Sequence, residues 1–354
     1  KASANKSEEI NTCIGCNQAC LDHVFERKRA SCLVNPVACY ETELTFSPVI
    51  EKKRIAVIGA GPAGAAFSVY ASQRGHNVSL FDGATAIGGQ FNIAKQIPGK
   101  EEFYETLRYF NTQLKKLNVA IHLSSYQSAQ GLIDGQFDEI VLATGIVPRE
   151  LPIKGINNKK VKTYLQVLRD KEPIGKKVAI VGAGGIGFDV ASYLAEAHSL
   201  SGEPEKWLAE WGVDKQYRHG GGMLNQSLHQ LSHKPSDREI YLLQRKAEKV
   251  GANLGKTTGW IHRASLKNKG VKMLNNVVYH EITDQGLLIE CSGNKQLLEV
   301  DNIIICAGQE PERSLYQALI DAGQSVHLIG GANIAAELDA KRAIRQGAEL
   351  AAKI

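Results

Sequence analysis

Four cysteines near the start of the chain have the spacing of a metal or iron-sulfur segment. They follow the pattern C-x2-C-x3-C-x11-C, so three thiols fall within eight residues and a fourth follows. One tight turn can present three soft ligands while the fourth completes a shell of four thiolates, a ligand set typical of iron-sulfur clusters. Structural zinc is the alternative, although zinc sites with four thiolates usually use two separated C-x2-C pairs. The residues are Cys13, Cys16, Cys20 and Cys32.

The other cysteines are expected to have different roles. Cys39 could replace Cys32, but we expect it to be a small buried apolar residue, and Cys306 ends an apolar run and is expected in a core. No cysteine occurs between Cys39 and Cys291, which is unlike a disulfide-linked secreted protein. This usage predicts a reducing compartment, the cytoplasm.

A glycine-rich turn after an apolar run predicts a first dinucleotide site. The run 55–58 leads into Gly-Ala-Gly-Pro-Ala-Gly and an apolar helix, and a second strand over 78–81 ends at Asp82. Glycines let the backbone approach a pyrophosphate, whose charge a helix N-terminus stabilises, and the acid can accept hydrogen bonds from a ribose 2′-hydroxyl. The expected contacts in the turn are Gly59, Gly61, Pro62, Ala63 and Gly64.

A second glycine-rich turn is followed by basic residues, where the first is followed by an acid. The run 178–181 precedes Gly-Ala-Gly-Gly-Ile-Gly, but the next strand, 240–243, comes only after an insertion over 198–237. It ends in two basic residues, and a guanidinium can bind a 2′-phosphate that a carboxylate would repel. This site is predicted to bind NADPH, the alternative being two exposed charges beyond a strand. The expected contacts are Gly182, Gly184, Gly185, Gly187, Arg245 and Lys246.

The elements around these turns predict an α/β fold with two interlocked Rossmann-like, doubly wound dinucleotide-binding domains, preceded by a small cysteine-rich iron-sulfur segment. This is the plan of two-domain flavin reductases, in which NAD(P)H reduces FAD. Gly145 follows an apolar run and is expected in a turn beside a cofactor. The expected divisions are 1–50 for the cysteine segment, 51–150 with 302–354 for the FAD domain, and 151–301 for the NADP(H) domain with its insertion at 198–237.

Composition argues against several functions. The 354 residues carry a net charge of +5, and the basic triplets are isolated, so we expect no nucleic-acid binding. The longest uncharged run, 55–73, contains loop-forming glycines and a proline, so we expect no membrane span. The first twelve residues are polar, which does not suit a signal peptide.

Five stretches closely resemble the bacterial NADPH-dependent 2,4-dienoyl-CoA reductases, and the resemblance covers essentially the whole chain. These stretches are 13–20, 31–36, 88–100, 255–263 and 305–311. The resemblance implies a [4Fe-4S] cluster on the four cysteines named above, FAD at the first glycine turn and NADPH at the second. It adds Gly89, Gln90 and Lys100 to the expected FAD contacts, and the backbone of Gly330 and Gly331 is expected to face the flavin although Asn333 stands where an acid is typical.

The same resemblance implies a partner for electron transfer. Members of this family carry an FMN-binding TIM barrel ahead of the cluster, and that barrel reduces 2,4-dienoyl-CoA in unsaturated fatty acid β-oxidation. No barrel precedes Cys13 here and the chain starts without Met, so we expect a fragment with NADPH:acceptor activity alone. Two alternatives stay open: an iron-sulfur flavoprotein like the glutamate synthase small subunit, and a non-catalytic NADP-binding module with structural zinc. Trimethylamine dehydrogenase relatives share the cysteine spacing but lack an NADPH-reducible FAD.

Overall fold

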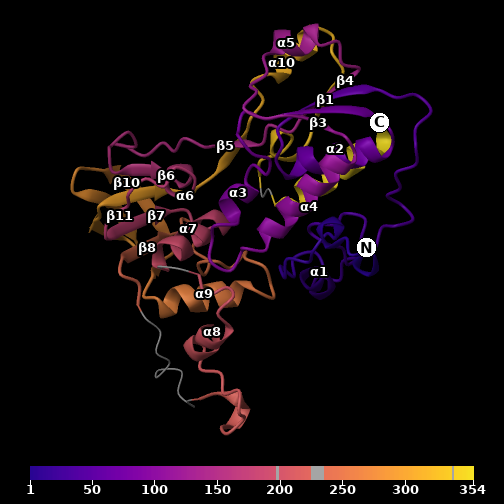
Figure 1. Cartoon of the computed structure of the whole chain (residues 1–354). Helices are drawn as coiled ribbons and strands as arrows, with labels where there is room; N and C mark the ends of the chain where they lie inside the picture. The colour runs from indigo at the N-terminus through magenta and orange to yellow at the C-terminus, as the bar shows by residue number, and fades with distance from the viewer. Residues whose placement is uncertain (197–198, 225–234, 337–338) are drawn as a thin grey trace. The chain divides into compact units, whose positions relative to one another are not determined.

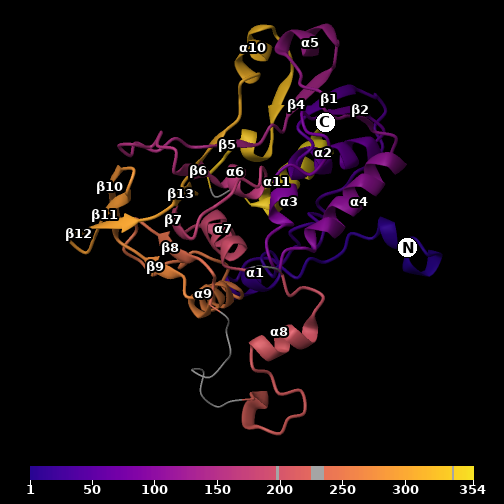
Figure 2. The same cartoon turned by 60° about the vertical axis from the view of Figure 1, so that its left-hand side comes forward.

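The computed structural model describes residues 1–196, 199–224, 235–336 and 339–354. The chain forms two compact units, whose elements are labelled in Figures 1 and 2. The first comprises Lys1–Ile93, Glu102–Arg149 and Gly308–Ile354, and the second comprises Ala94–Glu101 and Glu150–Ala307.

The first unit is built on a five-stranded parallel sheet with the order β15-β4-β1-β2-β3. The central strands are apolar and almost wholly buried, as expected for a parallel sheet covered on both faces. Strand β1 pairs with both β2 and β4, so successive strands are added first on one side of β1 and later on the other. Such folds bind ligands at the carboxyl end of the strand where this switch occurs. The strands are β1 (Arg54–Ile58), β2 (Asn77–Phe81), β3 (Ala120–His122), β4 (Glu139–Leu142) and β15 (Val326–Leu328).

Helix α2 (Pro62–Gln73) starts directly after the first glycine turn and is buried along most of its length. Proline at its first position fits there because that backbone position needs no hydrogen-bond donor. Helix α2 packs against α11 (Ala340–Lys353) at the other end of the chain. The remaining elements of this unit are α1 (Leu21–Phe25), α3 (Phe91–Ala94), α4 (Phe103–Lys116), α5 (Ala129–Asp134), α10 (Tyr316–Asp321), the 3-10 helices η1 (Ala2–Ala4), η2 (Ser7–Glu9) and η5 (Gly330–Ala332), and an antiparallel pair, β5 (Ile146–Pro148) with β14 (Gln309–Pro311).

A buried carboxylate ties three strands together at the amino end of this sheet. Glu139 accepts hydrogen bonds from Lys53 Nζ (2.5 Å), Ser325 Oγ (2.5 Å) and His327 Nε2 (2.9 Å). Burial alone would raise the pKa of Glu139, but these donors outweigh it and lower the pKa to about 2. The charged form therefore stabilises the contact between β1, β4 and β15.

The second unit has a parallel sheet with the order β6-β13-β7-β8-β9 and an antiparallel sheet with the order β10-β11-β12. Its strands are β6 (Val161–Thr163), β7 (Lys177–Val181), β8 (Glu239–Leu243), β9 (Lys272–Leu274), β10 (Val277–Ile282), β11 (Gly286–Cys291), β12 (Asn294–Glu299) and β13 (Asn302–Ile305). Its helices are α6 (Tyr164–Leu168), α7 (Gly185–Ala195), α8 (Pro204–Glu210), α9 (Gly259–Asn268) and the 3-10 helix η3 (Gly220–Gly222).

The α/β fold with parallel sheets is confirmed, but the expected divisions of the chain need correction. Strand β13 pairs with β6 and β7, so 302–305 completes the second sheet and the chain returns to the first unit at Gly308. The expected cysteine segment, 1–50, lies within the first unit. Part of the insertion forms α8 and η3, whereas its residues 198 and 225–234 lie outside the described residues. No helix in the described part of the chain has the length and apolarity needed to cross a membrane.

Candidate cofactor sites and the thiol segment

The first glycine turn fits tightly between β1 and β4. Gly59 has φ +108°, in the region that favours glycine, and a Cβ there would clash with the Ala143 carbonyl oxygen. A Cβ on Gly64 would clash with the carbonyl oxygen of Gly59. Both glycines are therefore needed for the turn itself and for seating α2 on the sheet. A Cβ on Gly61, by contrast, would lie 4.0 Å from its nearest neighbour, Gly89 Cα, so Gly61 is less confined.

Predicted residues from three distant parts of the chain meet at this turn. A Cβ added to Gly89 would lie 3.0 Å from Gly61 Cα, and one on Gly330 would lie 2.8 Å from Ala63 Cβ. A Cβ on Gly331 would lie 2.9 Å from the carbonyl carbon of Gly145. Such a cradle of bare backbone at the N-terminus of a buried helix fits a dinucleotide phosphate. Pro62 occupies the first helical position, and Gln90 is exposed beside Gly89.

Asp82 stands at the end of β2, as predicted, and is fixed by the turn. Its Oδ2 accepts a hydrogen bond from Ala60 N (2.6 Å), and its Oδ1 accepts one from Ala84 N (2.8 Å). An ionised carboxylate has about four lone-pair positions, so each oxygen keeps capacity for a further donor such as a ribose hydroxyl.

Lys100 belongs by its contacts to the second unit. Its Nζ lies 2.6 Å and 2.8 Å from the two carboxylate oxygens of Asp189 on α7. Burial lowers the pKa of nearby His262, and the Lys100 charge lowers it further. Sequence reasoning missed Asp189, although its position one helical turn after Gly185 was an available signal. A direct role of Lys100 toward FAD stays a prediction.

The second glycine turn repeats the first between β7 and β13. Gly182 has φ +108°, and a Cβ there would lie 2.9 Å from the Cys306 carbonyl carbon. A Cβ on Gly187 would clash with the carbonyl oxygen of Gly182. Gly184 and Gly185 have nothing within 4 Å of the position a Cβ would take, so the turn offers an open backbone surface at the start of α7. Burial raises the pKa of the Cys306 thiol, but the residue is only partly buried and is not in the core as expected.

The two predicted bases, Arg245 and Lys246, are exposed just beyond β8. Their loop is held by side chains that sequence reasoning did not identify. Gln244 Nε2 donates to the carbonyls of Lys246 (3.2 Å) and Glu248 (2.8 Å), and Asn275 Nδ2 donates to the same Glu248 carbonyl (3.3 Å). A braced loop reduces the entropy lost when its bases bind an anion.

The thiols of the four predicted cysteine ligands influence the ionisation of Cys16. Burial raises the pKa of the Cys16 thiol, and the thiols of Cys32, Cys20 and Cys13 raise it further, because a second negative charge nearby disfavours ionisation. Gly15, at φ +62°, turns the chain so that its N–H points to Cys13 Sγ at 3.4 Å. Four soft thiol donors suit an iron-sulfur cluster or zinc.

Two findings qualify this segment. Within the ranges that the structure describes, no three His, Cys, Asp or Glu side chains converge closely enough to hold a single metal ion. The expectation that Cys39 is buried is wrong, because this residue is exposed in a turn at φ +63° and its N–H donates to Glu41 Oε1 (3.0 Å).

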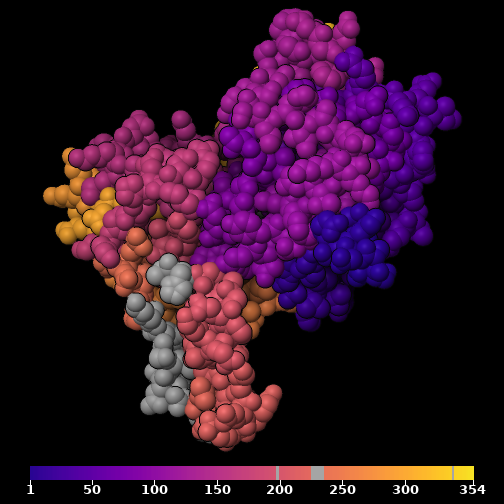
Figure 3. Space-filling model, viewed as in Figure 1, coloured from indigo at the N-terminus to yellow at the C-terminus, as the bar shows by residue number. Residues whose placement is uncertain are grey.

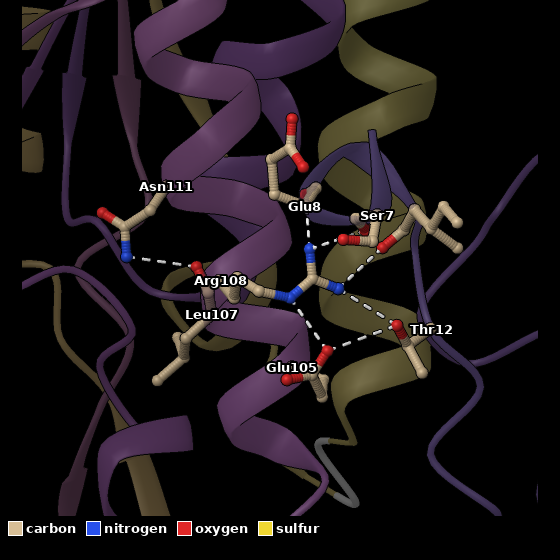
Figure 4. A network of polar contacts seen from close by, with 8 residues as sticks. Ser7, Glu8, Thr12, Glu105, Leu107, Arg108 and Asn111 are labelled. Carbon is tan, nitrogen blue, oxygen red and sulfur yellow. Dashed lines mark hydrogen bonds and ion pairs between the residues drawn. The ribbon is translucent and has the colours of Figure 1, made fainter. Parts of the chain in front are cut away.

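Arg108 on α4 anchors the residues that precede the first cysteine, as Figure 4 shows. Sequence reasoning missed this arginine, since nothing in its local pattern distinguishes it from other basic residues on helices. A second contact, Lys116 Nζ to Glu9 Oε2 (2.6 Å), lowers the pKa of Glu9 through its hydrogen bond. Arg108 donates to Ser7 O (3.2 Å), Glu8 O, Ile10 O (3.0 Å), Thr12 Oγ1 (3.1 Å) and Glu105 Oε2 (2.8 Å).

Two glycine cradles at the carboxyl ends of two parallel sheets define a flavin- and NAD(P)-dependent oxidoreductase. The chain belongs to the pyridine nucleotide-disulphide oxidoreductase family, whose model matches residues 53–327.

The known proteins that this chain resembles are longer than the chain itself. It is 32% identical to a metal reductase of Desulforamulus reducens over 346 residues, covering 94% of this chain and 49% of that protein. It is 29% identical to a bilirubin reductase of Mediterraneibacter gnavus over 350 residues, covering 98% of this chain and 48% of the relative. The structure of 2-naphthoyl-CoA reductase with 2-naphthoyl-CoA matches with a TM-score of 0.84 and 26% identity, covering all of this chain and 48% of that one. The chain thus spans about half the length of these relatives.

Proposed function

We propose that this chain is the electron-input module of a larger reductase of the 2,4-dienoyl-CoA reductase type. NADPH would bind at Gly182–Gly187, FAD at Gly59–Gly64, and a [4Fe-4S] cluster at the four N-terminal cysteines. When bound, FAD accepts a hydride as an electron pair and can release the electrons singly, and the cluster carries one electron at a time.

The observation that carries this proposal is the pair of glycine cradles, and the cysteine spacing in the sequence supports the cluster. In each cradle a Cβ is excluded at two glycines, and the open backbone lies at the start of a buried helix. Asp82 follows the first cradle and suits a ribose hydroxyl, whereas Arg245 and Lys246 follow the second and suit a 2′-phosphate. This division of charge supports FAD at the first site and NADPH at the second.

The partner and final substrate rest on the sequence resemblance. An FMN-binding TIM barrel, on the same polypeptide or a separate one, would receive the electrons and reduce 2,4-dienoyl-CoA. The similarity to 2-naphthoyl-CoA reductase supports a CoA thioester as the acceptor, and the similarity to a metal reductase and a bilirubin reductase is compatible with other acceptors.

Anaerobic stopped-flow spectroscopy tests the proposal. Purified protein reconstituted with FAD, iron and sulfide should show flavin bleaching by NADPH, followed by loss of cluster absorbance, and should reduce ferricyanide without reducing 2,4-dienoyl-CoA. A colourless protein with stoichiometric zinc and no bound flavin would instead support the non-catalytic NADP-binding module. Rapid dienoyl-CoA reduction by these 354 residues alone would contradict the need for a barrel.

A further inference from the structure

A groove in the second unit lies beside helix α9. One face of α9 lines it, together with residues 249–250 of the loop after β8 and residues 271, 273 and 275 in and beside the edge strand β9. Its volume is about 770 Å³, which is within the range of small-molecule sites. Its described lining residues all lie outside the second glycine turn, and orange atoms of the segment that contains α9 reach the surface in Figure 3. We call this cavity the α9 groove.

Trp260 on α9 gives the α9 groove a flat apolar surface. This residue is 57% exposed, and no aromatic ring or cation stacks on it in the part of the chain that the structure describes. Val250 and Val271, which are 5% and 7% exposed, add apolar surface to the lining. An indole with a free face can stack on the planar ring of a ligand, so the α9 groove suits a ligand that contains such a ring.

Three basic side chains line the same groove, namely Lys249, Arg263 and Lys267. Lys267 follows Arg263 by four residues on α9, so both lie on the helix face that carries Trp260. Arg263 Nη1 donates to the Gly251 carbonyl (2.7 Å), which orients a guanidinium that has five N–H donors in all. Within the described residues, no ion pair joins any of the three bases to a carboxylate, and no acidic residue lines the groove. The charge of the α9 groove therefore suits an anion.

We propose that the α9 groove binds a nucleotide, with the base on Trp260 and the phosphates at the three basic side chains. Lysine and arginine bind phosphate through charge-assisted hydrogen bonds. One exposed indole and a cavity of this size suit a single small molecule better than an acidic peptide or a nucleic-acid strand, which need more extended surfaces. The inference goes beyond the proposed function, which places NADPH and FAD at the glycine cradles, and does not depend on it. A purine base with phosphates occurs both in free nucleotides such as ADP and at the adenosine end of coenzyme A.

Calorimetric titration with ADP tests this site. The protein is first loaded with FAD and saturated with NADP⁺, so that both glycine cradles are occupied. About one ADP should then bind per chain, and Trp260→Ala and Lys267→Met should each weaken ADP binding at least about tenfold without changing NADP⁺ affinity or the melting temperature. Two matched controls should bind ADP as the wild type does: Trp207→Ala, which removes a tryptophan that is 46% exposed, and Lys295→Met, which removes an exposed charge from β12.

Other ligands separate the proposed site from its alternatives. Pyrophosphate should bind at least about tenfold more weakly than ADP, because it has no ring to stack on Trp260, and equal affinities would overturn the nucleotide assignment. Competition between NADP⁺ and ADP for one site, binding of polyglutamate in place of ADP, or unchanged ADP binding by Trp260→Ala would also overturn it.

Coenzyme A identifies the source of the ligand. Tighter binding of coenzyme A than of ADP, with the same loss in Trp260→Ala, would support the adenosine end of coenzyme A as the occupant, whereas weaker binding would support a free nucleotide. If NADP⁺ does not bind to the wild-type protein, the proposed function fails, but ADP binding and its loss in Trp260→Ala still decide whether the α9 groove is a nucleotide site.

Discussion

Replacing Arg108 by alanine should release the segment that leads into the first cysteine. The guanidinium donates to three carbonyls in residues 7–10, to Thr12 Oγ1 and to Glu105. A hydrogen bond to a charged group contributes about 1.5–3 kcal/mol, but this side chain is 28% exposed and water can replace part of the lost contacts. We therefore expect the whole anchor to contribute about 2–4 kcal/mol, which is roughly a 30- to 700-fold change in the local opening equilibrium.

Hydrogen-exchange mass spectrometry measures this opening directly. Peptides covering residues 7–12 should exchange faster in Arg108→Ala by a factor in that range, while peptides from β1 and β4 keep their protection because the sheet core is untouched. Asn111→Ala is the matched control, since Asn111 lies on the same helix and donates to Leu107 O (3.1 Å) within that helix. Equal exchange in Arg108→Ala and wild type, or equal acceleration in the Asn111 control, would refute the anchoring role.

Further outcomes follow from the sites. Arg245→Ala should weaken NADPH binding by about tenfold or more and leave NADH nearly unchanged, whereas Lys295→Met, which removes an exposed charge from β12, should affect neither; calorimetric titration checks both. Cys16→Ser should abolish iron incorporation, and retention of about four iron atoms per chain would speak against the assigned ligands. Gly184→Ala should lower NADPH affinity without changing the melting temperature, because its Cβ meets no protein atom. Glu139→Gln should lower the free energy of unfolding by roughly 2–3 kcal/mol at pH 7. Since the pKa of Glu139 is lowered to about 2, its contribution is present above the unfolded value and lost as pH falls toward 2, so urea unfolding of variant and wild type should converge in acid.

The local signals in the sequence were sufficient to predict the two glycine-rich turns and the strands and helices beside them. Strand, glycine turn, helix and terminal residue all lie within a short stretch, and the structure places Asp82 and Arg245 at the ends of the strands where the pattern predicts them. Contacts that join distant segments had no such signal. The pairing of Lys100 with Asp189 and the anchoring by Arg108 depend on which surfaces meet after folding.

The boundary of the second unit was missed for a related reason. An apolar run such as 303–305 fits either parallel sheet, and only pairing decides between them. Strands β10, β11 and β12 form a separate antiparallel sheet, and the strand that follows them, β13, lies between β6 and β7. The exposure of Cys39 was missed because a positive φ at a residue other than glycine depends on the surrounding turn, and composition alone does not reveal it.

The glycines of each turn separate into those that the fold needs and those that it does not. Gly182 and Gly187 are required because a side chain would meet neighbouring backbone, so their identity is explained without any ligand. Gly184 and Gly185 have open space, and Gly184 has φ −82°, which any residue can adopt. Folding therefore gives no reason for glycine at these two positions, whereas close approach of a pyrophosphate to the backbone does. This difference supports a nucleotide at the second turn independently of the sequence resemblance.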